Sequence, residues 1–270
     1  MPTTISTPAA QLWTDQRGCG EDVVLLPGLC ENALTWGDLP DRLAEHYRVT
    51  TVDLRGSARS TSPPRPWRIA DYVDDVDALL DGLDIHRAHL IGSCLGAVIA
   101  QEFAVAHPER VQSLVLNGTW RGSDPHFQAM LSSWIWTAQH AQDMRELMQV
   151  ISLSSRTPAQ WERGEVASDL DDTIRGLDYF AFRRGFTTAA RTLRAYDAGD
   201  RLQSIIAPTM LTVGSLDAVR GPLHTYELAG EITGSMVEVI RGAGRRPYLD
   251  EPRAFGDLVL RFVGAARHRG

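Results

Sequence analysis

The stretch Ala88–Ala106, AHLIGSCLGAVIAQEFAVA, decides the fold of this 270-residue chain. Its first six residues form an apolar run of strand length, and the residues from Ala97 onward have the composition of a helix. Between the two lies Gly92-Ser93-Cys94-Leu95-Gly96. A glycine two residues before Cys94 and another two residues after it let a strand and a helix approach closely through a sharp turn. We therefore expect Cys94 at the tip of a strained strand-to-helix turn, with its side chain pointing off the edge of a sheet.

Apolar runs and helical segments alternate on both sides of this stretch, which predicts a mostly parallel, doubly wound α/β sheet covered by helices on both faces. Residues 120–198 interrupt the alternation because they carry helical composition and no strand signal. We predict a core made of residues 1–119 and 199–270, and a helical cap of residues 120–198 over the carboxyl ends of the strands, where open α/β sheets bind ligands. The expected strands are Val23–Gly28, Tyr47–Gly56, Ala88–Ser93, Val111–Gly118, Ala207–Asp217 and Met236–Gly244, and the expected helices of the core are Asp38–Glu45, Ile69–Leu83, Ala97–Ala106, Leu223–Ala229 and Pro252–Ala265.

The composition excludes several classes of protein. Apolar residues make up 43% of the chain and charged residues 23%, which are ordinary values for a globular protein. A net charge of −7 disfavours nucleic acid and anionic membranes as partners. All 27 basic residues are arginine, which excludes lysine chemistry such as a Schiff base or the lysine of a P-loop.

Cysteine usage and the N-terminal residues predict a cytoplasmic protein. The three cysteines are an odd number without the spacing of a disulfide framework, as expected in a reducing compartment. The N-terminal residues lack the basic and apolar regions of a signal peptide, and no uninterrupted apolar stretch approaches the length of a membrane span. The eight histidines and the cysteines show no metal-ligand spacing, so we expect neither a metal nor a cofactor.

Five segments resemble, in the same order, the motifs of the α/β-hydrolase superfamily over nearly the whole chain. They are LLPGLCENALTW (25–36), VDLRGSARS (52–60), the turn around Cys94, PTMLTVGSLD (208–217) and GAGRRPYLDEPRAF (242–255). The resemblance implies an α/β-hydrolase fold with a helical cap insertion. It places Cys94 where relatives carry a nucleophile, Asp217 at the acid of the catalytic triad and Arg245 at its histidine. It also implies that the backbone N–H groups of Leu29 and Leu95 bind an oxyanion, and it puts Asn117 at the second acid position of the family.

A cysteine tolerates the loss of the histidine better than a serine would. A thiolate is a strong nucleophile, and a neighbouring cation and a helix N-terminus both favour it. Arginine stabilises negative charge but cannot accept a proton, because its pKa lies above about 12. Asp217 would then hold the guanidinium of Arg245 instead of an imidazole. Alternatively, Cys94 is an inert buried residue, Arg245 a solvated one and Asp217 only a helix cap.

The preferred function is a non-standard enzyme that acts on an acyl or thioester-like substrate through Cys94. Dieckmann cyclases, a subgroup of the superfamily, also carry cysteine at this turn, although they keep the histidine. The resemblance therefore favours acyl transfer, cyclisation or release of a polyketide-like intermediate, as in antibiotic biosynthesis. Two alternatives stay open: a lyase, cyclase or isomerase that forms no covalent intermediate, and a ligand-binding pseudo-hydrolase without turnover.

The expected partner is a small molecule with a large apolar or aromatic part, either free or tethered to a carrier protein. The cap is rich in aromatic residues, and such walls suit an apolar or planar ligand, although most of them must pack the cap onto the sheet. The candidate residues for contacting substrate, besides Leu29 and Leu95, are Cys30 in the loop after the first expected strand, Trp120, Trp134 and Trp136 in the cap, and His224, which follows Asp217 closely enough to reach the pocket rim.

Overall fold

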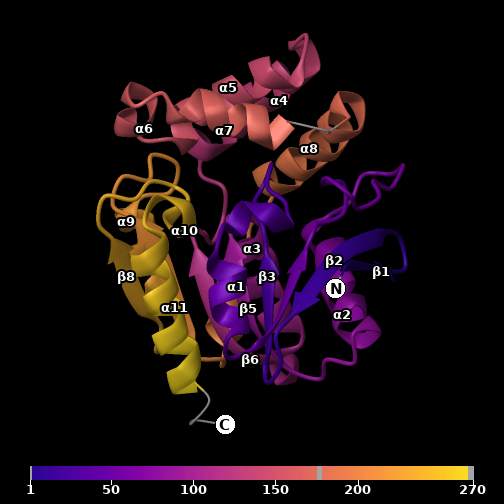
Figure 1. The fold of residues 1–270 in the computed structure, drawn as a ribbon, viewed down its shortest axis with the longest axis vertical. Helices are drawn as coiled ribbons and strands as arrows, with labels where there is room; N and C mark the ends of the chain where they lie inside the picture. The colour runs from indigo at the N-terminus through magenta and orange to yellow at the C-terminus, as the bar shows by residue number, and fades with distance from the viewer. Residues whose placement is uncertain (1, 175–177, 267–270) are drawn as a thin grey trace.

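The computed structural model describes residues 2–174 and 178–266, which form a sheet between helices and a further layer of helices above it (Figure 1). The strands are β1 (Pro2–Ser6), β2 (Gln11–Arg17), β3 (Asp22–Leu26), β4 (Arg48–Val52), β5 (Ala88–Ser93), β6 (Val111–Asn117), β7 (Thr209–Gly214) and β8 (Met236–Ile240). The helices of the core are α1 (Leu39–Ala44), α2 (Ile69–Gly82), α3 (Leu95–Ala106), α9 (Pro222–Ala229), α10 (Pro247–Asp250) and α11 (Pro252–Ala266).

The strands join in one sheet in the order β1-β2-β4-β3-β5-β6-β7-β8. From β4 to β8 every neighbouring pair is parallel, which confirms the mostly parallel doubly wound sheet that the sequence predicts. The antiparallel strands β1 and β2 extend one edge and were not expected. In β2 only Leu12 and Thr14 are buried, with the half-buried Trp13 between them, which is too short an alternation to stand out in the sequence.

Alternate residues of the central strands face two separate layers of the core. Val23 and Leu25 pack with α1 and α11 on one face, whereas Val24 and Leu26 pack with α2 and α3 on the other. A parallel sheet buried on both faces needs such continuous apolar strands, and β3 supplies one. The central strands therefore form a rigid platform whose carboxyl ends carry the loops of the site.

The turn between β5 and α3 depends on its two glycines. A Cβ on Gly96 would lie 1.9 Å from the carbonyl oxygen of Leu26, and one on Gly92 would lie 2.5 Å from the backbone of Gly96. Neither position can accept a side chain without moving backbone. This close packing places the first turn of α3 directly against the end of β3.

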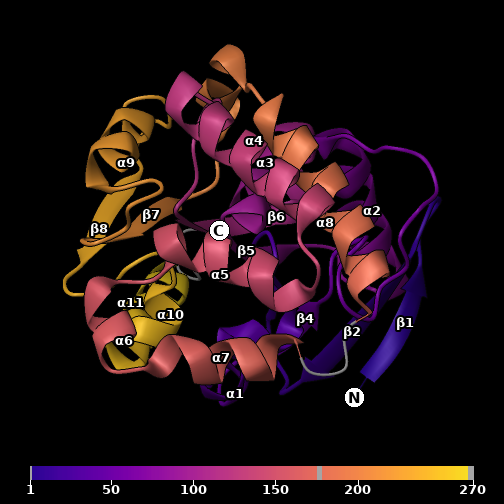
Figure 2. The same ribbon diagram turned by 90° about the horizontal axis from the view of Figure 1, so that it is seen from above.

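In the part of the chain that the structure describes, five α-helices between β6 and β7 form the layer above the carboxyl ends of the strands (Figures 1 and 2). Two short backbone hydrogen bonds tie the segment entering this layer to the one leaving it, from Ala198 N–H to Arg121 and from Ser123 N–H to Tyr196. The layer therefore begins and ends over the same part of the sheet. Its helices are α4 (Pro125–His140), α5 (Met144–Ser155), α6 (Pro158–Glu162), α7 (Glu165–Ile174) and α8 (Tyr179–Arg194).

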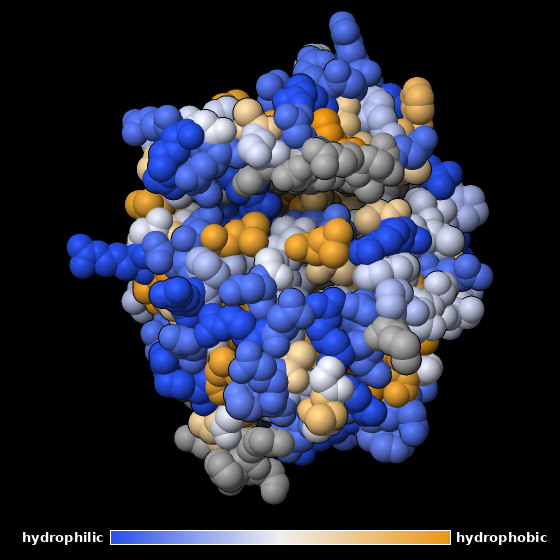
Figure 3. All heavy atoms as spheres, viewed as in Figure 1, coloured by the Kyte–Doolittle hydropathy of each residue, from blue (hydrophilic) through white to orange (hydrophobic). Residues whose placement is uncertain are grey.

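On the face shown in Figure 3, hydrophilic residues predominate and hydrophobic ones lie scattered between them. Across residues 2–174 and 178–266, no helix combines the length and the apolar character that crossing a membrane requires.

Candidate active site

Cys94 lies at the tip of the turn between β5 and α3, in a backbone conformation that is rare outside glycine. Its φ is 51° and its ψ is −108°, and its N–H donates to the carbonyl of Asn117 over 2.9 Å. Such strained backbone persists only where surrounding structure holds it, and it concentrates at functional sites. Leu95 is the first residue of α3, so its N–H has no acceptor within the helix and is directed toward the same end of the sheet.

Arg245 reaches Cys94 from the segment between β8 and α10. Its Nη2 lies 2.6 Å from Cys94 Sγ, and both side chains are buried. Burial lowers the pKa of Arg245, but Cys94 and Asp217 raise it more strongly, so the guanidinium stays protonated. The sulfur of Cys94 is therefore in direct contact with a permanent positive charge.

Asp217 follows β7 and lies on the far side of the guanidinium. Its Oδ2 is 3.6 Å from Arg245 Nη1, which makes an ion pair without a hydrogen bond. Its Oδ1 accepts the backbone N–H groups of Val219 and Arg220 over 2.8 and 3.1 Å. Asp217 thus caps a turn and faces Arg245 at the same time; it does not cap a helix, because α9 begins later, with Gly221 as its N-cap.

A cavity with a volume of about 50 Å³ opens beside Cys94. It lies between the sheet and the layer of helices α4 to α8, which is called the cap from here on. Trp134 of α4 and Met148 and Ile151 of α5 line it together with Cys94 and Arg245. Leu29 and Cys30 also line it, and a second small cavity touches Leu29, Cys30 and Leu95. None of the described residues that line the first cavity is a histidine.

The loop after β3 brings Cys30 into the site with a positive φ of 66°. Burial raises the pKa of Cys30 well above its usual value, and the neighbouring Cys94 and Glu31 raise it further, against the opposing effect of Arg245. Cys30 therefore stays a neutral thiol at neutral pH. It offers an apolar wall rather than a second nucleophile.

Three of the residues expected to touch substrate lie away from this cavity. Trp120 is buried against Phe127 and the guanidinium of Arg220. Trp136 is 61% exposed and stacks on His140. His224 lies near Asp124, with 3.7 Å between His224 Nε2 and the carboxylate. Of the three predicted tryptophans, Trp134 alone is among the described residues lining the cavity beside Cys94.

The structure adds site residues that sequence reasoning did not single out. Glu31 lines the cavity, and its carboxylate accepts the O–H of Tyr248 and the N–H of Gly28, each over 2.7 Å. Arg156 of the cap and Arg246 of the core line the same cavity. Glu31 belongs to the motif LLPGLCENALTW, so its carboxylate could have been recognised in the sequence. Its hydrogen bond with Tyr248 could not, because the two residues lie far apart in the chain.

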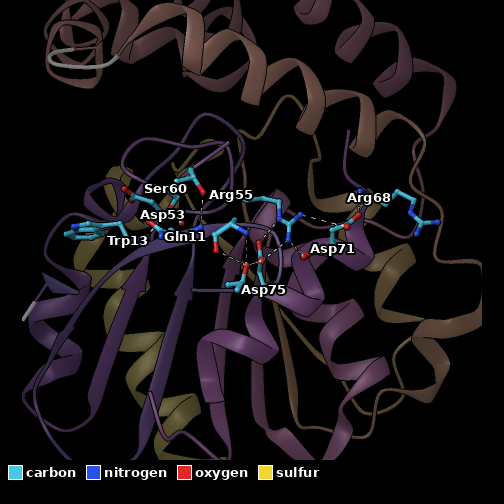
Figure 4. A network of polar contacts seen from close by, with 11 residues as sticks. Gln11, Trp13, Asp53, Arg55, Ser60, Arg68, Asp71 and Asp75 are labelled. Atoms are coloured by element: carbon cyan, nitrogen blue, oxygen red, sulfur yellow. Dashed lines mark hydrogen bonds and ion pairs between the residues drawn. The ribbon is translucent and has the colours of Figure 1, made fainter. Parts of the chain in front are cut away.

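A buried polar network holds the turn beside the second cavity (Figure 4). Arg55 donates to both carboxylate oxygens of Asp75 over 2.6 and 2.7 Å, and both side chains are buried. Asp53 accepts the N–H of Ala33, which follows the loop containing Glu31, over 2.8 Å. The VDLRGSARS motif therefore fixes the position of the loop that faces Cys94. None of the described hydrogen bonds joins the motif itself to the sulfur of Cys94.

Asn117 stabilises the segment that carries Arg245. Its side-chain amide donates to the carbonyl of Arg245 over 3.1 Å and to Ser93 Oγ over 3.4 Å. The position therefore supports the backbone of Arg245 and provides no acid. Within the described part of the chain, no group of three or more His, Cys, Asp or Glu side chains is arranged to hold a metal ion.

Comparisons with known proteins agree with this architecture. Residues 23–252 match the family model described as alpha/beta hydrolase fold. A putative carbamate hydrolase, RutD, of Caulobacter segnis is 26% identical over 258 residues, covering 92% of this chain and 93% of that protein. An uncharacterised protein of Mycobacterium tuberculosis is 27% identical over 266 residues, covering 91% of this chain and 76% of that protein.

Solved structures are similar over almost the full length. A hydrolase from Pseudomonas aeruginosa PA01 superposes with a TM-score of 0.89 at 28% identity, covering 97% of this chain and 98% of that one. The enol-lactonase from Burkholderia xenovorans LB400 has a TM-score of 0.88 at 22% identity, covering 97% and 100%, and its likeness concerns the fold alone.

Proposed function

This chain belongs to the α/β hydrolase fold family, and on that premise we propose that it is an acyl-handling enzyme whose nucleophile is Cys94. The observation that carries the proposal is the 2.6 Å contact between Arg245 Nη2 and Cys94 Sγ at the tip of a strained turn. A charge-assisted hydrogen bond from a buried guanidinium stabilises a thiolate without removing a proton itself. Asp217 supports the proposal by facing Arg245 from the other side.

The proposed substrate is a thioester-like acyl compound. Cys94 Sγ attacks the carbonyl carbon, and the developing oxyanion is bound by the N–H groups of Leu29 and Leu95. Collapse of the tetrahedral intermediate breaks the carbon–sulfur bond of the substrate and releases its thiolate. A thiolate leaves without being protonated, whereas an amine needs a general acid that Arg245 cannot provide. The site therefore suits a thioester better than an amide.

The proposed acyl group is largely apolar and derives from secondary metabolism, for example a polyketide-like intermediate on a carrier protein. Leu29, Trp134, Met148, Ile151 and Leu170 supply apolar walls next to Cys94. After acylation, a nucleophile takes the acyl group from Cys94, and when that nucleophile lies in the substrate itself the product is cyclised. This part of the proposal rests on the cysteine that the chain shares with Dieckmann cyclases.

Trapping of the acyl-enzyme tests the proposal. We expect the wild type to gain the mass of one acetyl group on Cys94 after brief exposure to p-nitrophenyl acetate or acetyl-N-acetylcysteamine, located by peptide mass spectrometry. Cys94→Ala should lose the modification, while a variant of the exposed Cys19, Cys19→Ala, should keep it. Full turnover by Cys94→Ala would replace the covalent mechanism with the non-covalent one. The absence of both modification and product would favour a pseudo-hydrolase.

A further inference from the structure

We propose that Glu31 is the general base of the deacylation step, in place of the histidine that relatives carry at position 245. The inference rests on the proposed function of Cys94 and concerns its second half-reaction. Arg245 stabilises a thiolate but cannot activate an incoming nucleophile. Within the described part of the chain, Glu31 is the carboxylate that lines the cavity beside Cys94.

Glu31 and Cys94 flank the same point. A Cβ placed on Gly28 would lie 2.6 Å from Glu31 Oε2 and 3.2 Å from Cys94 Cβ. The carboxylate and the side chain of Cys94 therefore lie close together on either side of Gly28, and both line the same cavity. A carboxylate in that position can accept the proton of a water molecule, or of an acceptor hydroxyl, that attacks a thioester on Cys94 from the cavity.

Two hydrogen bonds orient the carboxylate and leave it free lone pairs. Gly28 N–H donates to Oε2 and Tyr248 O–H donates to Oε1, each over 2.7 Å. An ionised carboxylate has about four acceptor sites, so two remain for the incoming nucleophile. Glu31 is partly buried, which keeps it in contact with the cavity while its two partners fix its position.

Tyr248 acts as the positioning residue for this carboxylate. Burial raises its pKa well above the usual value, and the negative charge of Glu31 raises it further, so the phenol stays protonated and donates. Ser93 lies 3.2 Å behind the phenol and Asn117 donates to Ser93. A chain of donors thus runs from β6 to Glu31, and every member except the carboxylate is buried.

Deacylation by Glu31 moves one proton and breaks one bond. Glu31 accepts a proton from water as the water oxygen forms a bond to the acyl carbon of the Cys94 thioester. The tetrahedral intermediate collapses, the acyl carbon–Sγ bond breaks, and Cys94 leaves as a thiolate held by Arg245. The product is a carboxylic acid, and the proton on Glu31 returns to solvent. An acceptor alcohol takes the same path and yields an ester.

The test separates acylation from deacylation with p-nitrophenyl acetate. In Glu31→Gln we expect the burst of p-nitrophenolate to persist, the steady-state rate to fall by about 10²-fold or more, and the acetylated Cys94 to accumulate in intact-protein mass spectra. The glutamine keeps an acceptor for Gly28 N–H. The matched control is Asp250→Asn, which removes a carboxylate that accepts the N–H of Gly244 in a neighbouring loop, and it should behave like the wild type.

A second variant guards against a purely structural effect. Glu31→Ala leaves space beside Gly28, and added sodium formate should restore its steady-state rate in a concentration-dependent way, with no such increase in the wild type or in Asp250→Asn. If Glu31→Gln deacylates as fast as the wild type, or if formate leaves Glu31→Ala unchanged, the role of Glu31 is wrong and that of Cys94 stands. If the wild type shows neither burst nor acetyl-Cys94, the proposed function itself fails.

Discussion

Arg245 places a permanent positive charge beside Cys94, at the position where the motif resemblance predicts a histidine. Its guanidinium contacts Cys94 Sγ at 2.6 Å and faces Asp217 at 3.6 Å, so it lies between the two groups that an imidazole would connect. A serine at position 94 would need a base in contact with its hydroxyl, which does not ionise near neutral pH, and Arg245 cannot be that base. The identities of residues 94 and 245 are therefore chemically coupled.

This coupling predicts the behaviour of a double variant at the residue scale. Cys94→Ser alone should lose ester hydrolysis, and adding Arg245→His should raise it by about 10²-fold or more, because an imidazole between the introduced hydroxyl and Asp217 restores general base catalysis. Initial rates with p-nitrophenyl acetate measure the effect. The control is Cys94→Ser combined with Arg246→His, which places the imidazole one residue further along the chain and so tests whether its exact position matters. Equal rates for the two double variants would contradict the prediction.

The sequence indicated the positions of Cys94, Asp217 and Arg245, and the structure places these three side chains together. The order and spacing of the motifs carried that information, because each residue follows the carboxyl end of a parallel strand and such ends share one edge. The pairing of Glu31 with Tyr248 could not be found in this way, because it joins residues 217 positions apart. The catalytic roles of all these residues stay predictions.

At the element scale, the strand-to-helix turn should resist any side chain at Gly96. Gly96→Ala places a Cβ 1.9 Å from the carbonyl of Leu26, which forces α3 away from β3. We expect the free energy of unfolding to fall by about 1–3 kcal/mol or more, measured by urea denaturation. Gly264→Ala in α11, whose Cβ would be 3.7 Å from the nearest atom it meets, Tyr47 Oη, should cause no such loss. A comparable loss in both variants would refute the steric argument.

The first helix of the cap is fixed to the core by Asp124. Its carboxylate caps α4 by accepting the N–H of Phe127 over 2.8 Å and pairs with the buried guanidinium of Arg220 over 2.5 Å. Asp178 caps α8 in a similar way but is exposed, and its carboxylate forms none of the described ion pairs. Asp124 therefore does more than a cap because it neutralises a buried charge.

Two alanine variants separate these contributions. Asp178→Ala should cost about 1 kcal/mol of unfolding free energy, the usual value of a lost cap, and Asp124→Ala should cost more because Arg220 is left unpaired. Burial raises the pKa of Asp124, but Phe127 N–H and Arg220 outweigh it and hold the pKa below its usual value. The stabilisation is thus complete above the usual aspartate pKa and is lost as pH falls through the lowered one. Urea denaturation across acidic pH should show the Asp124→Ala deficit shrinking; a constant deficit would contradict this assignment.

The elements of the core were easier to predict than the edge of the sheet. Strands β3 to β7 are buried along almost their whole length, and β3 is a continuous apolar run that hydrophobicity alone marks. Strand β1 is mostly exposed and β2 is mostly half-buried, and β2 pairs with β4, which lies far from it in the sequence. Likewise, the sequence identified aromatic residues in the cap, but which of them face the cavity depends on how α4 and α5 lie on the core.

At the scale of the whole molecule, the cavity beside Cys94 is small and is covered on one side by helices of the cap. Its volume of about 50 Å³ is far below the roughly 300–1,000 Å³ of ordinary ligand pockets. On one side the roof rests directly on the core, since a Cβ on Gly185 of α8 would lie 1.9 Å from the carbonyl oxygen of Gly56. We therefore expect that a substrate of the proposed class reaches Cys94 only after a displacement of the cap.

Thiol labelling measures that displacement. Cys19 is exposed and Cys94 is 6% exposed, so one chain carries both the probe and its reference. The quantity to compare is the labelling rate of Cys94 divided by that of Cys19. We expect this ratio to be about tenfold or more lower with the bulky N-(1-pyrenyl)maleimide than with N-methylmaleimide, which corresponds to about 1.4 kcal/mol of additional free energy for opening the cap. Peptide mass spectrometry distinguishes Cys94 from Cys30. Asp124→Ala should make the two reagents more alike in their Cys94 to Cys19 rate ratio. If that ratio is the same for both reagents in the wild type, the site is already open.

We expect the close contact between Gly185 and Gly56 to limit the rate of the proposed reaction. If entry and departure both require the cap to part from the core, the frequency of that opening sets an upper limit on turnover that a more reactive sulfur cannot raise. For substrates that react slowly, the turnover rate would then be set by the bond-breaking step. For substrates that react fast, it would be set by the opening of the cap and would be the same for all of them. Substitutions in α8 that never touch an acyl group would raise or lower that shared limit.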